Sequence, residues 1–467
     1  MRLQLFSLAT VLTFAVAATS TAQEAGKYDH YTIYDTDLPT RAEYAARRSQ
    51  AIAAMDDRSA LLVRAADVKN RSNDVDYEFR QRNNLLYLTG VTEDESALLL
   101  VPKGIIINGA VVHQVLFVKE RSPQSETWTG ITLGPATAAT VTGIQTVLPY
   151  SQLAPQMKQL FPQITTLYYD DWKFGTEREP LTGAAYAWEE EMTKPVEAAA
   201  PSLVVKNAGI ILNPMRLVKS PKELALMQRA IDASIEGHRQ TIQAAKPGMH
   251  EYEFEAVMEY AFQRNGARWP GYPSIVGSGP NTCILHYETN RRKSEPGDVV
   301  LMDCGAEYHG YSADITRTFP VSGKFTAEQR TLYDLVLKAQ NAGIAECRSG
   351  NNFRDPHRAA NKVIADGLVT LGIIQNSGQV GRYFMHGTSH YLGLDVHDVG
   401  DYGTLVPGVV LTVEPGVYIK AGSPCDPKWW NIGIRIEDDI LVTAQGPVNM
   451  SAALERTAEE IEGLMKQ

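Results

Sequence analysis

Cysteine is scarce in this sequence, and no long run of basic residues occurs in it. Four cysteines in 467 residues are too few for a fold built on disulfide bonds. Lysine and arginine total 44 against 54 acidic residues, and the formal net charge of -10 argues against a basic surface for nucleic acid or anionic lipid. Beyond the amino-terminal leader, no apolar run reaches the roughly 18 residues of a membrane-spanning helix. These absences exclude a disulfide scaffold, a nucleic-acid partner and a membrane span in the body of the chain.

The composition is otherwise that of a folded, acidic protein. Hydrophobic residues make up 44% of the chain and charged residues 21%, which argues against disorder over most of its length. A chain of 467 residues exceeds what one hydrophobic core usually serves, so we expect at least two domains. The first half contains neither a phosphate-binding loop nor a Gly-x-Gly-x-x-Gly fingerprint. A protein that acts on small molecules or peptides fits these features.

The first 22 residues have the pattern of a secretory signal peptide. Met1 and Arg2 precede an apolar run, 3–18, and a stretch of small residues that ends at Ala22, where we predict cleavage. The alternative is an uncleaved membrane anchor, for which the apolar run is short. We therefore expect an exported protein, periplasmic or secreted, with no stable membrane anchor. Export would permit disulfide bonds, and the sequence does not indicate which of its cysteines would pair: Cys283, Cys304, Cys347 and Cys425.

Residues 27–205 are predicted to form an α/β accessory domain. Thr40 and Glu43 have the spacing of a capping box, which indicates the start of a helix. Short apolar runs alternate with helical patterns along the rest of this region. The predicted strands are 60–63, 85–88, 97–101, 115–118 and 165–169, and the predicted helices are 41–55, 151–160 and 181–193.

Residues 206–467 are predicted to form an α+β domain of antiparallel strands framed by pairs of helices. A second capping box joins Ser220 to Glu223, with proline at the first helical position. The predicted helices are 221–245, 251–264, 328–347 and 354–371, and the predicted strands are 299–307, 311–321, 409–419 and 432–443.

Two aspartates occupy an apolar hairpin in the second domain. His309 and Gly310 have the pattern of a tight turn, which predicts that Tyr308 pairs with Tyr311. In that register Asp303 lies opposite Thr316, and Asp314 is a diagonal neighbour on the same face. Two buried carboxylates on one face repel each other, and a bound cation would relieve that repulsion. The alternative is exposure of both acids to solvent, for which the apolar neighbours leave less room.

Three histidines fall within one short glycine-rich segment: His386, His390 and His397. A lone histidine is more often a core or surface residue than a ligand, but three in one segment favour a site. Ser389 beside His390 raises the alternative of a serine nucleophile. The pattern around this serine lacks the second glycine of a nucleophile elbow, which argues against that alternative.

Two further acids, Glu414 and Glu437, lie in apolar strands. Strand alternation places Arg435 and Glu437 on one face, so a structural salt bridge between them is the alternative to metal binding. Taken together, four carboxylates and one imidazole form an oxygen-rich candidate set. Such a set suits two divalent ions bridged by carboxylates, with Mn, Co and Zn all compatible. The candidate ligands are Asp303, Asp314, His390, Glu414 and Glu437.

The order and spacing of these five residues resemble the dinuclear metal signature of the pita-bread metallopeptidases. Within that group the sequence is similar to the proline-peptidase branch, and most closely to bacterial aminopeptidase P. The resemblance covers most of the chain after the leader. It implies an α/β amino-terminal domain of the aminopeptidase P type and a pita-bread catalytic domain. The segments that carry the resemblance are 74–90, 275–287, 303–320, 386–400 and 414–439.

The resemblance also implies roles for individual residues. Glu414 would be both a metal ligand and the group that passes a proton to the leaving nitrogen. His286 and His397 would hold the substrate carbonyl and stabilise the oxyanion. His386 would line a proline pocket, and Arg435 would bind substrate or orient a neighbouring ligand. The implied cofactor is a pair of divalent ions, with Mn expected ahead of Co or Zn.

The implied reaction is hydrolysis of the bond between an amino-terminal residue and a following proline. The expected partners are therefore peptides with proline at the second position. The nearest alternative is a prolidase, which cleaves Xaa-Pro dipeptides and would use identical ligands. A remote alternative is a catalytically silent peptide-binding module of the same fold. Relatives commonly form dimers or tetramers, so a homo-oligomer is also expected.

Overall fold

The computed structural model describes residues 31–170, 176–178 and 180–466. The predicted leader, 1–22, lies outside the described residues and stays a prediction. None of the helices in the described ranges is both long enough and apolar enough to cross a membrane.

The chain divides into two compact units, Met1–Ile211 and Leu212–Gln467. The division predicted from sequence lies a few residues earlier, between residues 205 and 206. Helix α8 (Gly209–Leu217) runs across the observed division.

The first unit is built on a mixed six-stranded sheet with the strand order β10-β7-β1-β4-β5-β6. Its central strand β1 pairs antiparallel with β4 and parallel with β7, so the α/β class is confirmed. The strands are β1 (Ser59–Arg64), β4 (Ala97–Ile107), β5 (Ala110–Val118), β6 (Val147–Pro149), β7 (Thr166–Tyr169) and β10 (Val204–Asn207). Two small hairpins accompany the sheet: β2 (Asn70–Ser72) with β3 (Val75–Asp76), and β8 (Thr176–Arg178) with β9 (Ala185–Ala187).

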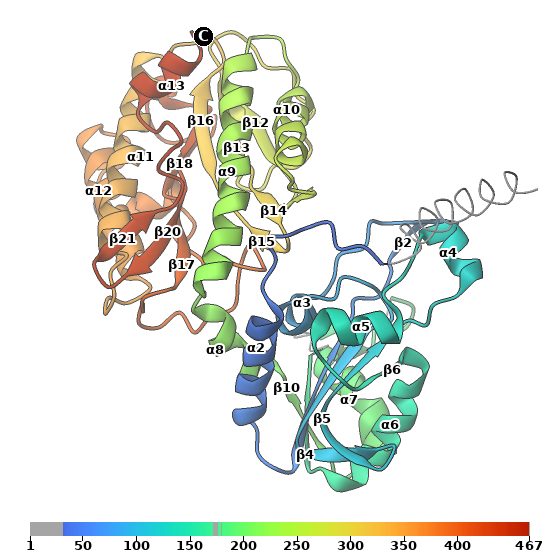
Figure 1. The fold of residues 1–467 in the computed structure, drawn as a ribbon. Helices are drawn as coiled ribbons and strands as arrows, with labels where there is room; N and C mark the ends of the chain where they lie inside the picture. The colour runs from blue at the N-terminus through green and yellow to red at the C-terminus, as the bar shows by residue number, and fades with distance from the viewer. Residues whose placement is uncertain (1–30, 171–175, 179, 467) are drawn as a thin grey trace, which may run out of the picture. The chain divides into compact units, whose positions relative to one another are not determined.

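Helices cover this sheet, and helix α5 packs against β5 and β6 (Figure 1). The capping box predicted at Thr40 and Glu43 is formed at the start of α2. Buried side chains of β1, β4 and β5 form the centre of the core, because these strands are covered on both faces. The helices are α2 (Arg41–Ala53), α3 (Asn83–Thr89), α4 (Pro123–Thr129), α5 (Gly134–Thr142), α6 (Leu153–Leu160) and α7 (Trp188–Ala199), with the short 3-10 turns η1 (Tyr150–Gln152) and η2 (Phe161–Gln163).

The strand predicted at 85–88 is wrong, because these residues form helix α3. A short apolar run does not by itself distinguish a strand from a buried helix. Two buried arginines of α2 hold the last turn of α3 by hydrogen bonds that the sequence pattern did not indicate. Arg47 donates to the carbonyl of Tyr87, and Arg48 donates to the carbonyl of Leu88, each at 2.9 Å. The helix predicted at 181–193 is also partly wrong, since α7 begins only at Trp188.

The second unit contains several small antiparallel sheets, with the strand orders β11-β14-β15, β12-β13-β16, β17-β20-β21 and β18-β19. The α+β class with antiparallel strands is therefore confirmed. The strands are β11 (Trp269–Pro270), β12 (Ile275–Ser278), β13 (Val299–Asp303), β14 (Ala306–Tyr308), β15 (Tyr311–Ser312), β16 (Thr316–Pro320), β17 (Val410–Val413), β18 (Gly416–Ile419), β19 (Ile432–Arg435), β20 (Asp438–Thr443) and β21 (Gly446–Asn449).

Two pairs of helices flank these strands (Figure 1). Helix α9 packs against α10 and contacts β14 and β15, whereas α11 packs against α12 and contacts β17 to β19. The capping box at Ser220 and Glu223 is formed, as predicted. The helices are α9 (Pro221–Ala244), α10 (Glu251–Arg264), α11 (Ala327–Glu346), α12 (Asp355–Thr370) and α13 (Ala458–Leu464), with the 3-10 turns η3 (Gly279–Cys283), η4 (Ser377–Arg382) and η5 (Pro427–Trp429).

Each of the four long strands predicted in this unit is interrupted. The predicted hairpin register is confirmed, because Tyr308 pairs with Tyr311 and Asp303 pairs with Thr316. The hairpin nevertheless divides between two sheets. At Gly305 the backbones approach so closely that a Cβ atom would lie 1.9 Å from the carbonyl oxygen of Ala313. Alternation of residue types carries no signal for such a close approach, and glycine permits it.

All four cysteines are free, which answers the question that the sequence left open. Cys283, Cys304 and Cys347 are buried, and Cys425 is partly exposed. Burial raises the pKa of the Cys283 thiol to about 11. Burial also raises the pKa of Cys304 and Cys347. Buried thiols with a raised pKa are unreactive, so these three cysteines act as small apolar side chains in the core.

Candidate metal centre

The four predicted carboxylate ligands share one structural context, since each lies where a strand ends or is about to begin. They are Asp303 at the end of β13, Asp314 before β16, Glu414 after β17 and Glu437 after β19. At these points the backbone leaves the regular ladder, and the side chains converge from different sheets. The strand interruptions that the sequence pattern did not predict are therefore the positions that form the site.

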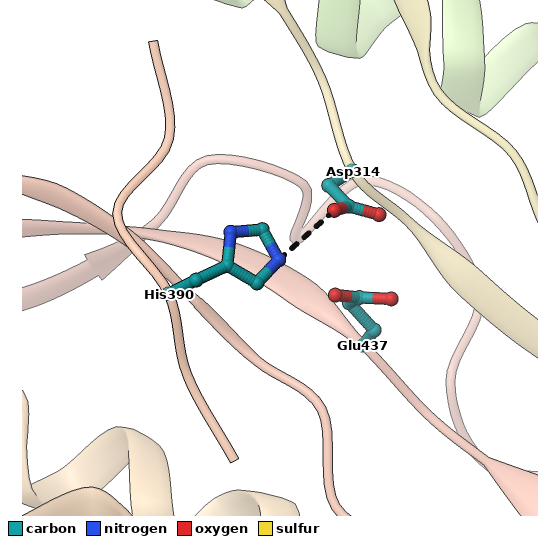
Figure 2. A group of neighbouring side chains, drawn as sticks. All are labelled: Asp314, His390 and Glu437. Atoms are coloured by element: carbon teal, nitrogen blue, oxygen red, sulfur yellow. Dashed lines mark ion pairs between the residues drawn. The ribbon is translucent and has the colours of Figure 1, made fainter. Parts of the chain in front are cut away.

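Three of the five predicted ligands form a compact group. One ligand atom from each of Asp314, His390 and Glu437 lies within 4.8 Å of the others. Figure 2 shows how the three side chains point toward one another. The Nε2 atom of His390 lies 3.2 Å from Oδ2 of Asp314. These residues come from three separate segments of the chain, so only the folded unit brings them together.

The other two predicted ligands border this group. The hydroxyl oxygen of Tyr272 lies 2.6 Å from Oδ1 of Asp303 and 2.7 Å from Oδ1 of Asp314, which places the two aspartates side by side. The Oε1 atom of Glu414 lies 3.7 Å from Nε2 of His390. All five residues selected from the sequence thus meet at one place.

His390 is oriented as metal-binding histidines usually are. Its Nδ1 atom lies 3.1 Å from the carbonyl oxygen of Tyr391, which can only accept a hydrogen bond. Nδ1 therefore carries the hydrogen, and Nε2 faces the carboxylates. Burial lowers the pKa of His390, but the hydrogen bond and charge of Asp314 outweigh it and raise the pKa to about 9. A backbone carbonyl that holds the second ring nitrogen is a common support for a metal ligand.

The charge balance of the site fits divalent cations. Burial, followed by the charge of Asp303, raises the pKa of Asp314. Burial raises the pKa of Glu414 to about 7, and burial with the charges of Asp314 and Glu414 raises that of Glu437 well above its ordinary value. Four clustered carboxylates face one guanidinium, that of Arg435, and one imidazole. Such an excess of buried negative charge is costly unless cations neutralise it.

Arg435 pairs with Asp303 and not with Glu437. Its Nη2 atom lies 2.6 Å from Oδ2 of Asp303. Burial raises the pKa of Asp303, but the charge of Arg435 outweighs it, so the net shift is downward. The Nε atom of Arg435 donates to the hydroxyl of Thr316 at 3.1 Å, and that hydroxyl donates to Oε2 of Glu437 at 2.5 Å. This geometry favours orientation of two ligands by Arg435 over the predicted direct contact with substrate.

His386 belongs to the same hydrogen-bond network. Its Nδ1 atom donates to the carbonyl of Gly387 at 2.7 Å, and its Nε2 atom lies 2.9 Å from the hydroxyl of Tyr418. Burial, then the charge of Arg435, lowers the pKa of His386 to about 4, so the ring is neutral near pH 7. Nε2 therefore accepts the hydrogen of the Tyr418 hydroxyl, whose oxygen accepts from Arg435 at 3.0 Å. Nδ1 of His386 lies 3.6 Å from Oε2 of Glu414.

His397 lies beside His390, and His286 lies near enough to His397 to influence its pKa. The ring centroids of His397 and His390 are 4.0 Å apart. Burial lowers the pKa of His397 to about 4, and the nearby charges of His390 and His286 act in the same direction. His286 itself is exposed, on the segment that follows η3. Imidazoles at these two positions are suited to donate hydrogen bonds to a bound carbonyl.

Sequence reasoning missed three polar residues of the site: Tyr272, Thr316 and Tyr418. Thr316 could have been found, because the predicted hairpin register already placed it opposite Asp303. Tyr272 follows Pro270 and Gly271, a pattern that indicates a turn but no chemistry. Tyr418 lies in an apolar strand and is buried, so its hydroxyl role depends entirely on the tertiary fold.

We predict that Tyr272→Phe weakens metal binding about 10- to 100-fold, as loss of a group that supports metal ligands typically does. The substitution removes the hydroxyl that holds Asp303 beside Asp314 and leaves the ring in place. Competition with a fluorescent chelator measures the metal affinity. Tyr260→Phe is the matched control, because the Tyr260 side chain is exposed on α10. Equal affinity in both variants would contradict a supporting role for Tyr272.

Comparisons with known proteins agree with this geometry. Residues 225–444 match "Metallopeptidase family M24", and residues 44–168 match "Aminopeptidase P, N-terminal domain". The Xaa-Pro aminopeptidase of Escherichia coli (strain K12) is 38% identical over 440 residues, which cover 91% of this chain and 98% of that protein. The Xaa-Pro aminopeptidase of Haemophilus influenzae is 36% identical over 444 residues, which cover 92% and 99%.

Solved structures extend the comparison to the whole fold. Proline aminopeptidase P II from Yersinia pestis aligns with a TM-score of 0.83 at 37% identity, covering 92% of this chain and all of that chain. Both domains, including the pita-bread arrangement of the second, follow this relative. The chain belongs to the Xaa-Pro aminopeptidase, or aminopeptidase P, family of M24 metallopeptidases.

Proposed function

We propose that this chain is a metal-dependent aminopeptidase that removes the amino-terminal residue from peptides with proline at the second position. The observation that carries the proposal is the meeting of Asp314, His390 and Glu437, bordered by Asp303 and Glu414, in a protein of this family. A structure of Escherichia coli aminopeptidase P with the inhibitor Pro-Leu aligns with a TM-score of 0.83 over 92% of this chain. The remote alternative of a silent binding module is not favoured, because every predicted ligand is present.

The five predicted ligands would hold two divalent ions. When bound, such ions polarise a carbonyl and lower the pKa of a water molecule. Oxygen-rich ligands suit Mn, which we propose ahead of Co or Zn. One solved structure of Escherichia coli aminopeptidase P is a Zn-substituted form in complex with product, so Zn belongs in any comparison of metals.

The residues of this chain have separable tasks in the proposed reaction. Burial raises the pKa of the Glu414 carboxyl to about 7. Glu414 would pass a proton to the prolyl nitrogen, which leaves poorly until it is protonated. His397 and His286 would donate hydrogen bonds to the carbonyl oxygen. The proposed place of His386 is beside the proline ring.

A comparison of two substrates tests the proposal. The chain from residue 23 onward, loaded with Mn, is incubated with an Xaa-Pro-Xaa tripeptide and with an Xaa-Pro dipeptide. We expect cleavage of the tripeptide after its first residue and little cleavage of the dipeptide. An Xaa-Ala-Xaa tripeptide serves as the control for proline preference. Cleavage of the dipeptide alone would replace the proposal with prolidase activity.

We also propose export of the chain through its first 22 residues. The support is the basic start, the apolar run and the small-residue end of that segment. Amino-terminal sequencing of the protein recovered outside the cytoplasm tests this, and an intact Met1 would contradict cleavage. Assembly into dimers or tetramers is a further proposal, which light scattering of the purified chain would test.

A further inference from the structure

A further histidine reaches the site from helix α12. His357 lies in the first turn of that helix, half-buried. Its Nδ1 atom lies 2.9 Å from the hydroxyl oxygen of Thr388, which is fully buried. The ring centroid of His357 is 5.5 Å from that of Phe384, which is also buried. His357 thus contacts the segment 384–390 at both sides of His386.

Each of these two contacts leads directly to a residue of the site. The ring of Phe384 meets the ring of His386 edge to face, with centroids 5.1 Å apart. The carbonyl of Thr388 accepts a hydrogen bond from the backbone N–H of Glu414 at 2.9 Å. A shift of His357 would therefore reach His386 through an aromatic ring and Glu414 through a backbone bond.

The rest of the segment has little regular structure to hold it. Residues 385–389 form no helix or strand, and Gly387 lies within them. Its main fixed points are the hydrogen bond of His386 to Tyr418, the backbone bond of Thr388 to Glu414, the bond of His390 to Thr412, and the two contacts of His357. Among these, His357 alone comes from a helix, whose backbone is rigid.

We propose that His357 is a positioning residue for the proposed peptidase reaction, so the inference rests on the proposed function. It holds the segment 384–390 against α12 and so maintains the arrangement of His386 and Glu414, whose Nδ1 and Oε2 atoms are 3.6 Å apart. Its hydrogen bond and its ring contact are with Thr388 and Phe384, neither of which is a predicted metal ligand. Its loss is expected to reduce turnover while metal binding is retained.

Three substitutions separate the hydrogen bond from the ring contact. His357→Phe keeps a ring against Phe384 and removes the bond to Thr388. Thr388→Val removes the hydroxyl at nearly constant volume. His357→Asn keeps a polar atom where Nδ1 lies. We expect kcat for an Xaa-Pro tripeptide to fall about tenfold in each of the first two variants, the size of one lost hydrogen bond, and to recover largely in the third.

The double variant His357→Phe with Thr388→Val provides the decisive comparison. If one shared bond is responsible, its kcat is no lower than that of either single variant, because each already lacks the bond. Metal affinity, from chelator competition, is expected to stay unchanged throughout. Lys362→Ala, an exposed position farther along α12, is the control. Wild-type kcat in His357→Phe, or additive losses in the double variant, would overturn the inference.

A measurement independent of activity distinguishes failure of this inference from failure of the proposed function. The ring nitrogen signals of His386 are recorded by NMR in every variant, with His386→Gln used for assignment. We expect the same shift in His357→Phe and Thr388→Val and none in Lys362→Ala. An unmoved His386 signal would overturn the positioning role. Absence of Xaa-Pro cleavage by the unsubstituted chain would instead refute the proposed function.

Discussion

Alanine at Asp303 is expected to lower kcat/KM for an Xaa-Pro tripeptide at least about a thousandfold, because a metal ion contributes several kcal/mol to a hydrolytic transition state. Asp303 meets Asp314 through Tyr272 and is paired with Arg435. Its removal would delete a predicted ligand and leave the Arg435 guanidinium buried without its carboxylate partner. Steady-state kinetics at saturating Mn provide the measurement.

The same loss is expected for Glu414→Ala, but for an additional reason. Glu414 is both a predicted ligand and the group proposed to pass a proton to the leaving nitrogen. Glu414→Gln keeps an oxygen for coordination and removes the proton site, so we expect it to retain more metal than Glu414→Ala without recovering turnover. Metal content per chain, from atomic absorption, separates these two effects.

Asp366→Ala is the control for both substitutions, because Asp366 is an exposed aspartate on α12. It should retain wild-type kinetics and metal content. Near-normal turnover in both Asp303→Ala and Glu414→Ala would refute the assignment of the metal centre. A dialysis against chelator that abolishes activity, followed by recovery with Mn, would confirm that the loss in the variants is a loss of metal chemistry.

The second large effect concerns stability. Asp438→Ala is expected to lower the free energy of unfolding of the second unit by about 3–5 kcal/mol, the usual result of breaking a buried ion pair. Asp438 pairs with Arg317 at 2.8 Å, and neither side chain is exposed. The substitution leaves the Arg317 guanidinium buried without its counter-charge. Urea unfolding, followed by circular dichroism, measures the change.

Lys362 and Asp366 provide the contrasting ion pair. Their side chains are 75% and 63% exposed, one helical turn apart. Asp366→Ala is expected to change stability by at most about 1 kcal/mol, since water already solvates both charges. Equal costs for the buried and the exposed pair would contradict the expected dependence on burial. Because unfolding of a two-unit chain need not be two-state, the comparison uses the same transition in each variant.

The buried ion pair also has a link to the metal centre. Arg317 donates to the backbone carbonyl of Glu437 at 2.7 Å and to that of Thr316 at 2.9 Å. It therefore fixes the chain at the interruption between β19 and β20 where Glu437 lies. We expect Asp438→Ala to reduce metal affinity as well, through the position of Glu437.

Local patterns in the sequence were sufficient for much of the fold. Both capping boxes are formed, because a capping box depends on residues three positions apart. The register that pairs Asp303 with Thr316 is formed, because a tight turn determines which residues face each other. The prediction of a strand at 85–88 was wrong because the structure of this segment depends on contacts with a distant part of the chain. Its helix is stabilised by Arg47 and Arg48, about forty positions earlier in the chain.

The candidate site, too, was predictable from the sequence only in part. Family resemblance and residue type selected all five ligands, and the structure brings all five together. For Arg435 the sequence left two roles open, contact with substrate and orientation of a neighbouring ligand. In the structure its guanidinium pairs with Asp303 on another sheet and reaches Glu437 through the hydroxyl of Thr316. His357 carried no signal at all, since its partner Thr388 lies 31 positions away.

The sequence by itself predicted the two-domain organisation, the register of the antiparallel hairpin and the five candidate ligands. The first two depend on composition and local hydrogen bonding, and the candidate ligands were selected by residue type and family resemblance. Only the tertiary structure decided where strands end, which carboxylate Arg435 pairs with and how Tyr272, Tyr418 and His357 support the site. Such contacts join segments that are distant in the sequence. They become strong only when folding buries them, because the interior has a lower dielectric constant than water.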